Sequence, residues 1–375
     1  MSEYQYYEFL AVDHPLTEAQ MQTLRAISTR AEITTTRFAN HYSFGDLKAD
    51  PLKLLARFFD VHVYVAMGCV RQLALRLPRE AIDRDAVQGY RADEVLRIVE
   101  SGDHVIVELG RALEEFREWD TGEGWMSALT GVRTALLAGD RRPLYLGWLA
   151  SLDGEARDEV EPPVPPGLAT LPAALEALAR FLWVDEHLVA AAAEGSPSDT
   201  LETAALAEWI GALSAAEKDA LLLRVAQGQH AAVASALGRR FRAAQGSARP
   251  AAPPPRTVRQ LFDRATELRA IAAEQSARRA AEARRQREAA ATAARARHLD
   301  LLAGQESTLW LKVRSLLFST TPRAYDEATA HLIDLRDLAA RAGADFEFAG
   351  RLAALRRNHA RKRSFINRLD AAGLK

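Results

Sequence analysis

Residues 61–77 read VHVYVAMGCVRQLALRL, and this stretch decides the fold of the first part of the chain. Val61, Val63, Val65 and Met67 recur at a period of two, so they share one face of an extended segment. The run VRQLALRL follows after a brief turn. We therefore predict two neighbouring strands here, which belong to a sheet.

The segments that precede this pair alternate between strand and helix signals. Aromatic and β-branched residues predict strands at 4–12 and 33–42. Between them, Thr17 and Gln20 form a capping-box pattern, which predicts the start of a helix. Asp50 stands directly before a proline and predicts a second helix start.

The segments that follow complete the predicted domain. VLRIVE and HVIVEL flank Ser101-Gly102-Asp103, a pattern typical of a hairpin. The order of elements predicts an α+β domain over residues 1–110, with a ferredoxin-like type of sheet and helices on one face. The rest of the chain is expected to be mostly α-helical.

From residue 111 to 245 the patterns are helical, and we predict a separate helical domain. The proline-rich segment 159–167 is expected to be a loop, and so is EWDTGEGW (118–125). ALEALARFLWVDEHLVAAA continues the helical pattern, and Ser214 with Glu217 forms another capping box. The tryptophans lie in apolar helical patterns and are predicted to be core residues: Trp119, Trp125, Trp148, Trp183, Trp209 and Trp310.

The last part of the chain divides into three segments. Small residues and prolines predict a Pro/Ala linker at 246–256. A long Ala/Arg/Glu helix is expected at 257–304, because these residues lose little side-chain entropy in a helix. Amphipathic segments at 305–375 predict a small module of helical hairpins, similar to a tetratricopeptide unit, with a helix break near Lys362 and Ser364 as the cap.

The composition is that of a globular protein, with 48% apolar and 26% charged residues in 375. We see no signal-peptide pattern and no apolar run long enough to span a membrane, so we expect a cytoplasmic protein without a membrane partner. Cys69 is the only cysteine, which excludes internal disulfides and multi-cysteine metal knuckles.

The charge is unevenly distributed along the chain. Residues 1–248 carry 24 basic and 36 acidic side chains, a balance of −12, whereas 256–375 carry 24 basic and 14 acidic ones, a balance of +10. A basic tail predicts contact with nucleic acid or with an acidic protein surface, including the chain's own N-terminal half.

The stretch 278–298, RRAAEARRQREAAATAARARH, leaves three hypotheses open. The favoured one is a solvated connecting helix, because large apolar residues for a coiled coil are missing. Contact with a phosphate backbone is the second, since 256–299 carry 11 Arg against 5 acidic residues, although these arginines do not keep one face. Docking of a partner helix is the third. The candidate partner-binding residues here are Arg278, Arg279, Arg284, Arg285 and Arg287.

A second basic cluster lies at 355–365, LRRNHARKRSF, beside His359. It predicts either a site for an acidic or phosphate-bearing partner or a solvated helix end whose cations complement the helix dipole. Its candidate residues are Arg356, Arg357, Arg361, Lys362 and Arg363.

A search for catalytic patterns finds no P-loop, dinucleotide-binding, zinc-protease or nucleophile-elbow motif. The best polar cluster, NHYSFGD, places His41 and Asp46 at a strand end, and Cys69 with His62 is a weaker pair. We therefore expect no enzyme, no metal site and no cofactor.

Two stretches, WIGALSAAEKDALLLRVAQG (209–228) and the helical residues 325–374, resemble helical regions of bacterial SWIM zinc-finger proteins. The N-terminal YYEFLAVDHPLTEAQMQTLRAIS resembles uncharacterised bacterial proteins. The CxCx(n)CxH finger that defines the SWIM family is absent, because Cys69 stands alone. The binding roles of that finger therefore do not transfer to this chain.

These observations predict a non-catalytic interaction or adaptor protein of a bacterial cytoplasmic assembly, which contacts other proteins. The alternative is an accessory subunit that binds nucleic acid through its arginine-rich C-terminal helices. An enzyme with a site near His41 and Asp46 is the third hypothesis. The oligomeric state cannot be read from the sequence.

Overall fold

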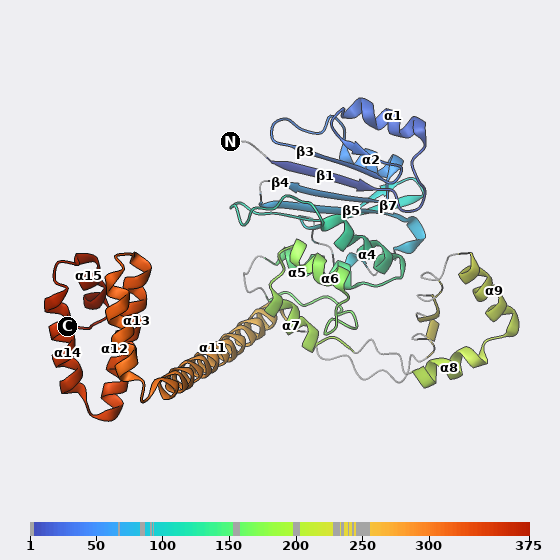
Figure 1. Cartoon of the computed structure of the whole chain (residues 1–375). Coiled ribbons are helices and arrows are strands. Elements are labelled where there is room, and N and C mark those ends of the chain that lie inside the picture. Colours follow the sequence, from blue (N-terminus) through green and yellow to red (C-terminus); the bar gives the residue numbers. More distant parts are fainter. Residues whose placement is uncertain are drawn as a thin grey trace. The chain divides into compact units, whose positions relative to one another are not determined.

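The computed structural model divides the chain into an N-terminal unit, Met1–Ala272, and a C-terminal unit, Ala273–Lys375 (Figure 1). The described residues are 4–66, 68–82, 87–90, 92, 94–152, 158–197, 203–227, 233, 236–238, 240–241, 244 and 256–375. Of the predicted linker 246–256, only Arg256 is among them.

A seven-stranded sheet is the centre of the N-terminal unit, and its strand order is β2-β3-β1-β4-β5-β7-β6. All pairs between neighbouring strands are antiparallel, so β3 and β4, which flank β1 and are joined through the helix Pro51–Phe58, run parallel to each other and form a split βαβ unit. The α+β class is confirmed, and the strands lie where the sequence patterns predict them, except that 33–42, predicted as one strand, contains two paired strands, β2 and β3. They are β1 (Gln5–Leu10), β2 (Glu32–Ile33), β3 (Arg37–Tyr42), β4 (Val61–Ala66), β5 (Val70–Pro78), β6 (Leu96–Ser101) and β7 (His104–Ala112).

One face of the sheet is covered by α1 (Glu18–Ile27) and α2 (Pro51–Phe58) (Figure 1). Both helices begin as predicted. The Thr17 hydroxyl accepts from the Gln20 amide in a complete capping box, and Asp50 caps α2. Leu24 and Leu55 then bury against the Phe9 face of the central strands.

The opposite face is covered by helices that the sequence suggested as a domain of their own (Figure 1). Val63, Leu73 and Val107 from the strands share one apolar core with Leu129 and Phe181 from these helices. Residues 1–110 and the helices between residues 125 and 194 therefore share one packed core. The covering helices are α4 (Trp125–Leu137), α5 (Arg142–Ser151), α6 (Ala173–Phe181) and α7 (Glu186–Glu194), and α8 (Thr203–Ala212) and α9 (Ala215–Ala226) follow.

Two local predictions in this region are wrong. The segment expected to continue as one helical pattern breaks between α6 and α7, where Trp183 takes a left-handed φ of 52° and Asp185 caps a new helix. Trp119 is 68% exposed and lies in the loop after β7, so it is not a core residue. The capping box of Ser214 is confirmed at the start of α9.

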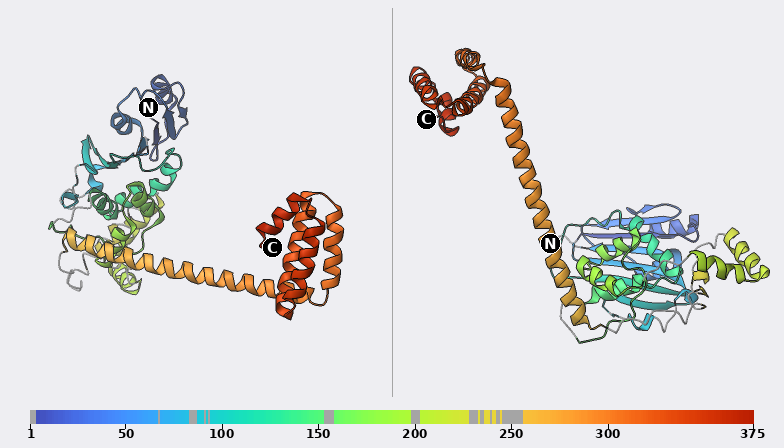
Figure 2. Two further views of the ribbon diagram at one scale, coloured as in Figure 1. Left: turned by 90° about the vertical axis from the view of Figure 1, so that its left-hand side faces the viewer. Right: turned by 90° about the horizontal axis from the view of Figure 1, so that it is seen from below.

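Helix α11 (Val258–Leu302) begins in the N-terminal unit and ends in the C-terminal unit, and it is a single uninterrupted helix (Figure 2). Its first turns bury Val258 and Leu261. Arg256, just before the helix, donates to the buried Glu161 carboxylate at 2.8 and 2.9 Å. Every residue from 269 to 294 is exposed, as expected for a solvated helix.

The C-terminal unit consists of the end of α11 and four further helices. Val313, Leu332, Phe365 and Leu369 are buried in its own apolar core. The helix break predicted near Lys362 is present, but the N-cap of the last helix is Lys362 and not Ser364. These helices are α12 (Glu306–Phe318), α13 (Pro322–Ala342), α14 (Asp345–Asn358) and α15 (Arg363–Ala371).

Candidate functional site: a basic groove between two helices

A cavity of about 500 Å³ lies between α12 and α14 in the C-terminal unit. Both helices pack on α13, which leaves a groove between them. The residues that line this groove, called the α12–α14 groove below, are Trp310, Arg314, Leu317, Phe318, Arg351, Ala354, Leu355, Asn358, His359 and Lys362.

Helical periodicity places the lining residues of α12 on one face of that helix. Trp310, Arg314 and Leu317 stand at i, i+4 and i+7 on α12, so they share one face. Trp310 meets α14 near the start of both helices, where its ring centroid lies 5.9 Å from that of Phe348. At the other end, Lys362 donates from its ammonium group to the Leu317 carbonyl. The two helices therefore run in the same direction and line the groove along its length.

The groove carries a one-sided charge, because none of the described residues that line it is acidic. The Arg351 guanidinium lies over the Trp310 ring, 5.2 Å from its centroid, and has only a long contact of 3.8 Å to Glu347. Arg314 is exposed and has no hydrogen bond or ion pair among the described residues. Together with Lys362, these two arginines give the groove three cationic side chains beside apolar and aromatic residues.

His359 contributes a different property. Two effects lower the pKa of the His359 imidazole below its usual value. Burial is the larger effect, and the nearby ammonium group of Lys362 is the smaller one. At neutral pH this side chain is therefore an uncharged hydrogen-bonding group within the groove. The site combines fixed cations with neutral polar groups and apolar walls, which suits binding of an anionic ligand.

The basic cluster predicted at 355–365 is only partly in this site. Lys362 lines the groove, whereas Arg356 points to Asp370 at 2.6 Å and to the Leu374 carbonyl at 2.7 Å. The other three members, Arg357, Arg361 and Arg363, are exposed outside the groove lining.

The predicted arginines of α11 are not brought together. At 100° per residue, Arg278 and Arg285 share one side of the helix, and Arg287 lies on the opposite side. Arg284 pairs with Glu288 at 3.1 Å, one turn along the helix, and Arg279 is exposed. This stretch of helix therefore presents no single basic face.

The basic cluster predicted at 355–365 leaves out six groove residues: Trp310, Arg314, Leu317, Phe318, Arg351 and Ala354. The signal available in the sequence was the spacing of Trp310, Arg314 and Leu317. It could not be completed, because the pairing of α12 with α14 is a tertiary contact.

The polar cluster suggested at His41 and Asp46 has another role. The Tyr7 hydroxyl shares its proton between two acceptors, an Asp46 carboxylate oxygen at 2.5 Å and the Gln5 amide oxygen at 2.8 Å. Burial raises the pKa of Tyr7 far above its usual value. His41 instead stacks on Tyr4, with the ring centroids 6.4 Å apart. The structure does not assemble these two residues into an acid–base pair.

The suggested pair of Cys69 and His62 is not assembled either. His62 is fully buried, stacks on Phe9 at 4.0 Å between centroids, and uses Nδ1 to contact the Glu8 carbonyl at 3.0 Å. Burial lowers the pKa of His62 to about 4. Cys69 lies in the turn after β4, with Sγ 4.0 Å from the Ala66 carbonyl oxygen.

A buried arginine holds the loop after β7. The Arg71 guanidinium donates to Glu118 at 2.8 Å and to Asp120 at 2.6 Å, and it lies 4.4 Å from the centroid of Trp183 and 4.9 Å from that of Trp125. These acidic and aromatic side chains enclose the Arg71 side chain, which is only 3% exposed. The loop expected at EWDTGEGW is therefore fixed by its acidic residues.

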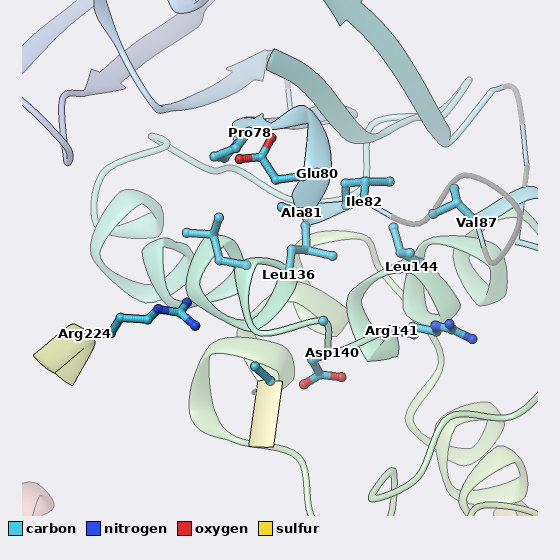
Figure 3. Close-up of a pocket in the computed structure, with 13 residues that line it drawn as sticks. Pro78, Glu80, Ala81, Ile82, Val87, Leu136, Asp140, Arg141, Leu144 and Arg224 are labelled. Carbon is cyan, nitrogen blue, oxygen red and sulfur yellow. The ribbon is translucent and has the colours of Figure 1, made fainter. Parts of the chain in front are cut away.

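A second cavity of about 500 Å³ lies in the N-terminal unit (Figure 3). Its lining mixes apolar side chains with Glu80, Asp140, Arg141 and Arg224, so its charges balance. Asp140 is already bound by Arg142, which donates to it from three nitrogen atoms. This cavity selects no ligand charge, and the α12–α14 groove is the stronger candidate.

Within the described residues, no group of three potential metal ligands comes together. No helix among them is both long and apolar enough to cross a membrane. Comparison with family models, curated proteins and solved structures found no match to this chain. The resemblance to SWIM zinc-finger proteins therefore stays a prediction.

Proposed function

We propose that this chain is a non-catalytic interaction protein of a cytoplasmic assembly, and that it binds a partner protein through the α12–α14 groove. The observation that carries the proposal is the charge of the groove. Arg314, Arg351 and Lys362 line it without an acidic counterpart among the described lining residues. Cations at a concave surface whose described lining contains no acidic residue attract a ligand that supplies carboxylates.

The exposed part of α11 supports the role of a spacer in such a protein. Residues 269–294 bury no side chain, and 26 residues correspond to about 39 Å of helix. This stretch adds nothing to the apolar core of either unit. Its charged side chains are distributed around the helix, which favours solvation over a specific phosphate contact.

Capture of partners by the full-length chain tests the proposal. The tagged protein is incubated with an extract of its native cells, with and without nuclease. The wild type is compared with the double variant Arg314→Glu, Phe318→Ala. Arg323→Glu is the matched control, because Arg323 is an exposed arginine of α13 outside the groove lining.

We expect a defined protein whose recovery falls about tenfold in the double variant and is unchanged in the control. Equal recovery of every protein by all three chains would contradict binding through the groove. Recovery that disappears with nuclease would instead support the nucleic-acid alternative predicted from the basic tail.

A further inference from the structure

We infer that the α12–α14 groove takes an acidic peptide segment whose carboxylates flank a large apolar side chain. This inference rests on the proposed function, because it specifies which kind of partner segment the groove binds. Three features of the groove support it: the position of its cations, the exposure of its aromatic rings and its apolar lining.

The cations are placed to receive more than one carboxylate. Arg314 stands on α12 and Arg351 on α14, so they belong to opposite walls, and Lys362 stands at the end of the groove. A guanidinium binds a carboxylate with two parallel hydrogen bonds, whereas an ammonium acts as a compact point charge. Acidic side chains spaced along a peptide can satisfy the two walls separately.

The aromatic rings disfavour single-stranded nucleic acid as the ligand. A base needs an open ring face on which to stack. Trp310 is 7% exposed, and its ring is already in contact with Phe348 and with the Arg351 guanidinium. Only Phe318, which is 89% exposed, is a free ring at the groove. One open ring beside apolar walls suits an apolar side chain better than a series of bases.

The apolar lining supplies a place for that side chain. Leu317, Ala354 and Leu355 lie between the cationic groups, and Phe318 stands at the same end as Lys362. Leu317 and Leu355 are already buried in the core of the unit, so Phe318, which is 89% exposed, supplies the apolar surface that a ligand side chain can cover. A peptide with acidic residues around a leucine or an aromatic residue matches this order, whereas a purely acidic peptide leaves Phe318 in water.

The inference is tested by selection from a library of random ten-residue peptides displayed on phage, with the immobilised full-length chain as the target. The most enriched peptides are synthesised with a fluorescent label, and their affinity is measured by anisotropy. Each is compared with a version in which Gln replaces Glu and Asn replaces Asp. A ten-nucleotide single strand of DNA is the competing probe.

We expect enriched peptides that combine acidic residues with at least one large apolar residue. Arg314→Gln and Phe318→Ala should each weaken binding about fivefold to tenfold, and Arg323→Gln should leave it unchanged. The neutral peptide versions should bind at least tenfold more weakly. Circular dichroism of the variants establishes that the helices are retained.

Three results would overturn the inference: selection without acidic enrichment, equal affinity of the neutral peptides, or tighter binding of the DNA strand. If the extract experiment still shows a groove-dependent protein partner in that case, the proposed function stands and only the ligand class is wrong. If that experiment also shows no groove-dependent protein, both are wrong.

Discussion

The buried ion pair between Arg71 and Asp120 tests how the N-terminal unit is held together. We predict that Asp120→Ala lowers its free energy of unfolding by about 3 kcal/mol, the lower end of the cost of removing one member of a buried pair. The Arg71 side chain is 3% exposed, so water cannot replace the lost carboxylate. The Trp125 indole and the Gly122 amide lose their acceptor as well. Glu118 stays as a second partner, which limits the loss.

Arg71→Met is the informative counterpart, and we expect it to cost only about 1 kcal/mol, mainly from lost contact with the indole rings. Methionine keeps much of the apolar volume and introduces no buried charge. The Glu118 side chain is 54% exposed and returns to water, while Asp120 keeps the N–H donors of Gly122 and Trp125. The two substitutions therefore differ because Arg71→Met leaves Asp120, which is 12% exposed, with two N–H donors, whereas Asp120→Ala leaves a cation that is 3% exposed with a single carboxylate partner.

Urea unfolding followed by tryptophan fluorescence measures this difference. Trp310 is the only tryptophan after residue 272, so a Trp310→Phe background restricts the signal to the N-terminal unit. With a slope of about 3 kcal/mol per molar urea, Asp120→Ala should lower the midpoint by about 1 M. Equal midpoint shifts for the two variants, or a larger shift for Arg71→Met, would refute the reasoning.

Three further predictions concern the same unit and use the same urea assay. Glu161→Gln should cost about 2–3 kcal/mol, because the buried guanidinium contact of Arg256 loses its countercharge; a loss under about 0.5 kcal/mol would contradict this. For His62, the unfolded side chain, with its ordinary pKa near 6.5, binds a proton as the pH falls, whereas the folded one resists until about pH 4. The free energy of unfolding should therefore fall by about 3 kcal/mol between pH 6.5 and 4, and His62→Gln should remove this part of the slope; an unchanged pH profile would show that another group is responsible. Gly68→Ala should cost at least about 3 kcal/mol, because φ is +66° and a Cβ would lie 2.0 Å from a backbone carbonyl oxygen. Gly45→Ala, at φ +83° with nothing within 4 Å, is its control and should cost about 1 kcal/mol; equal losses would mean that backbone conformation alone decides the effect.

The strands and their flanking helices could be predicted because their signals are local. The alternation of Val61, Val63 and Val65 and the caps at Thr17 and Asp50 each depend on residues only a few positions apart. The structure places β4, α1 and α2 where these signals indicate.

The packing of α4–α7 on the sheet could not be predicted from such signals. A helix that buries one face shows the same periodicity whether it packs on other helices or on a sheet. Leu129 and Leu178 meet Leu73 and Val107 of the strands in one core, yet nothing in the separate segments identifies that partner. A change from strand to helix patterns near residue 111 was therefore an insufficient sign of a domain boundary.

The groove shows why the density of charge along the sequence was a poor guide to the site. Arg356 and Arg357 are neighbours, yet helical geometry turns the first towards Asp370 and leaves the second in solvent. In contrast, Arg314 and Arg351 are far apart in sequence and line one cavity, because α12 and α14 pack on the same helix. A cluster of basic residues in the sequence shows only how many cations a helix carries. Their effect on a partner depends on which of them lack a carboxylate in the folded chain, and Arg314 is the clearest such residue of the groove.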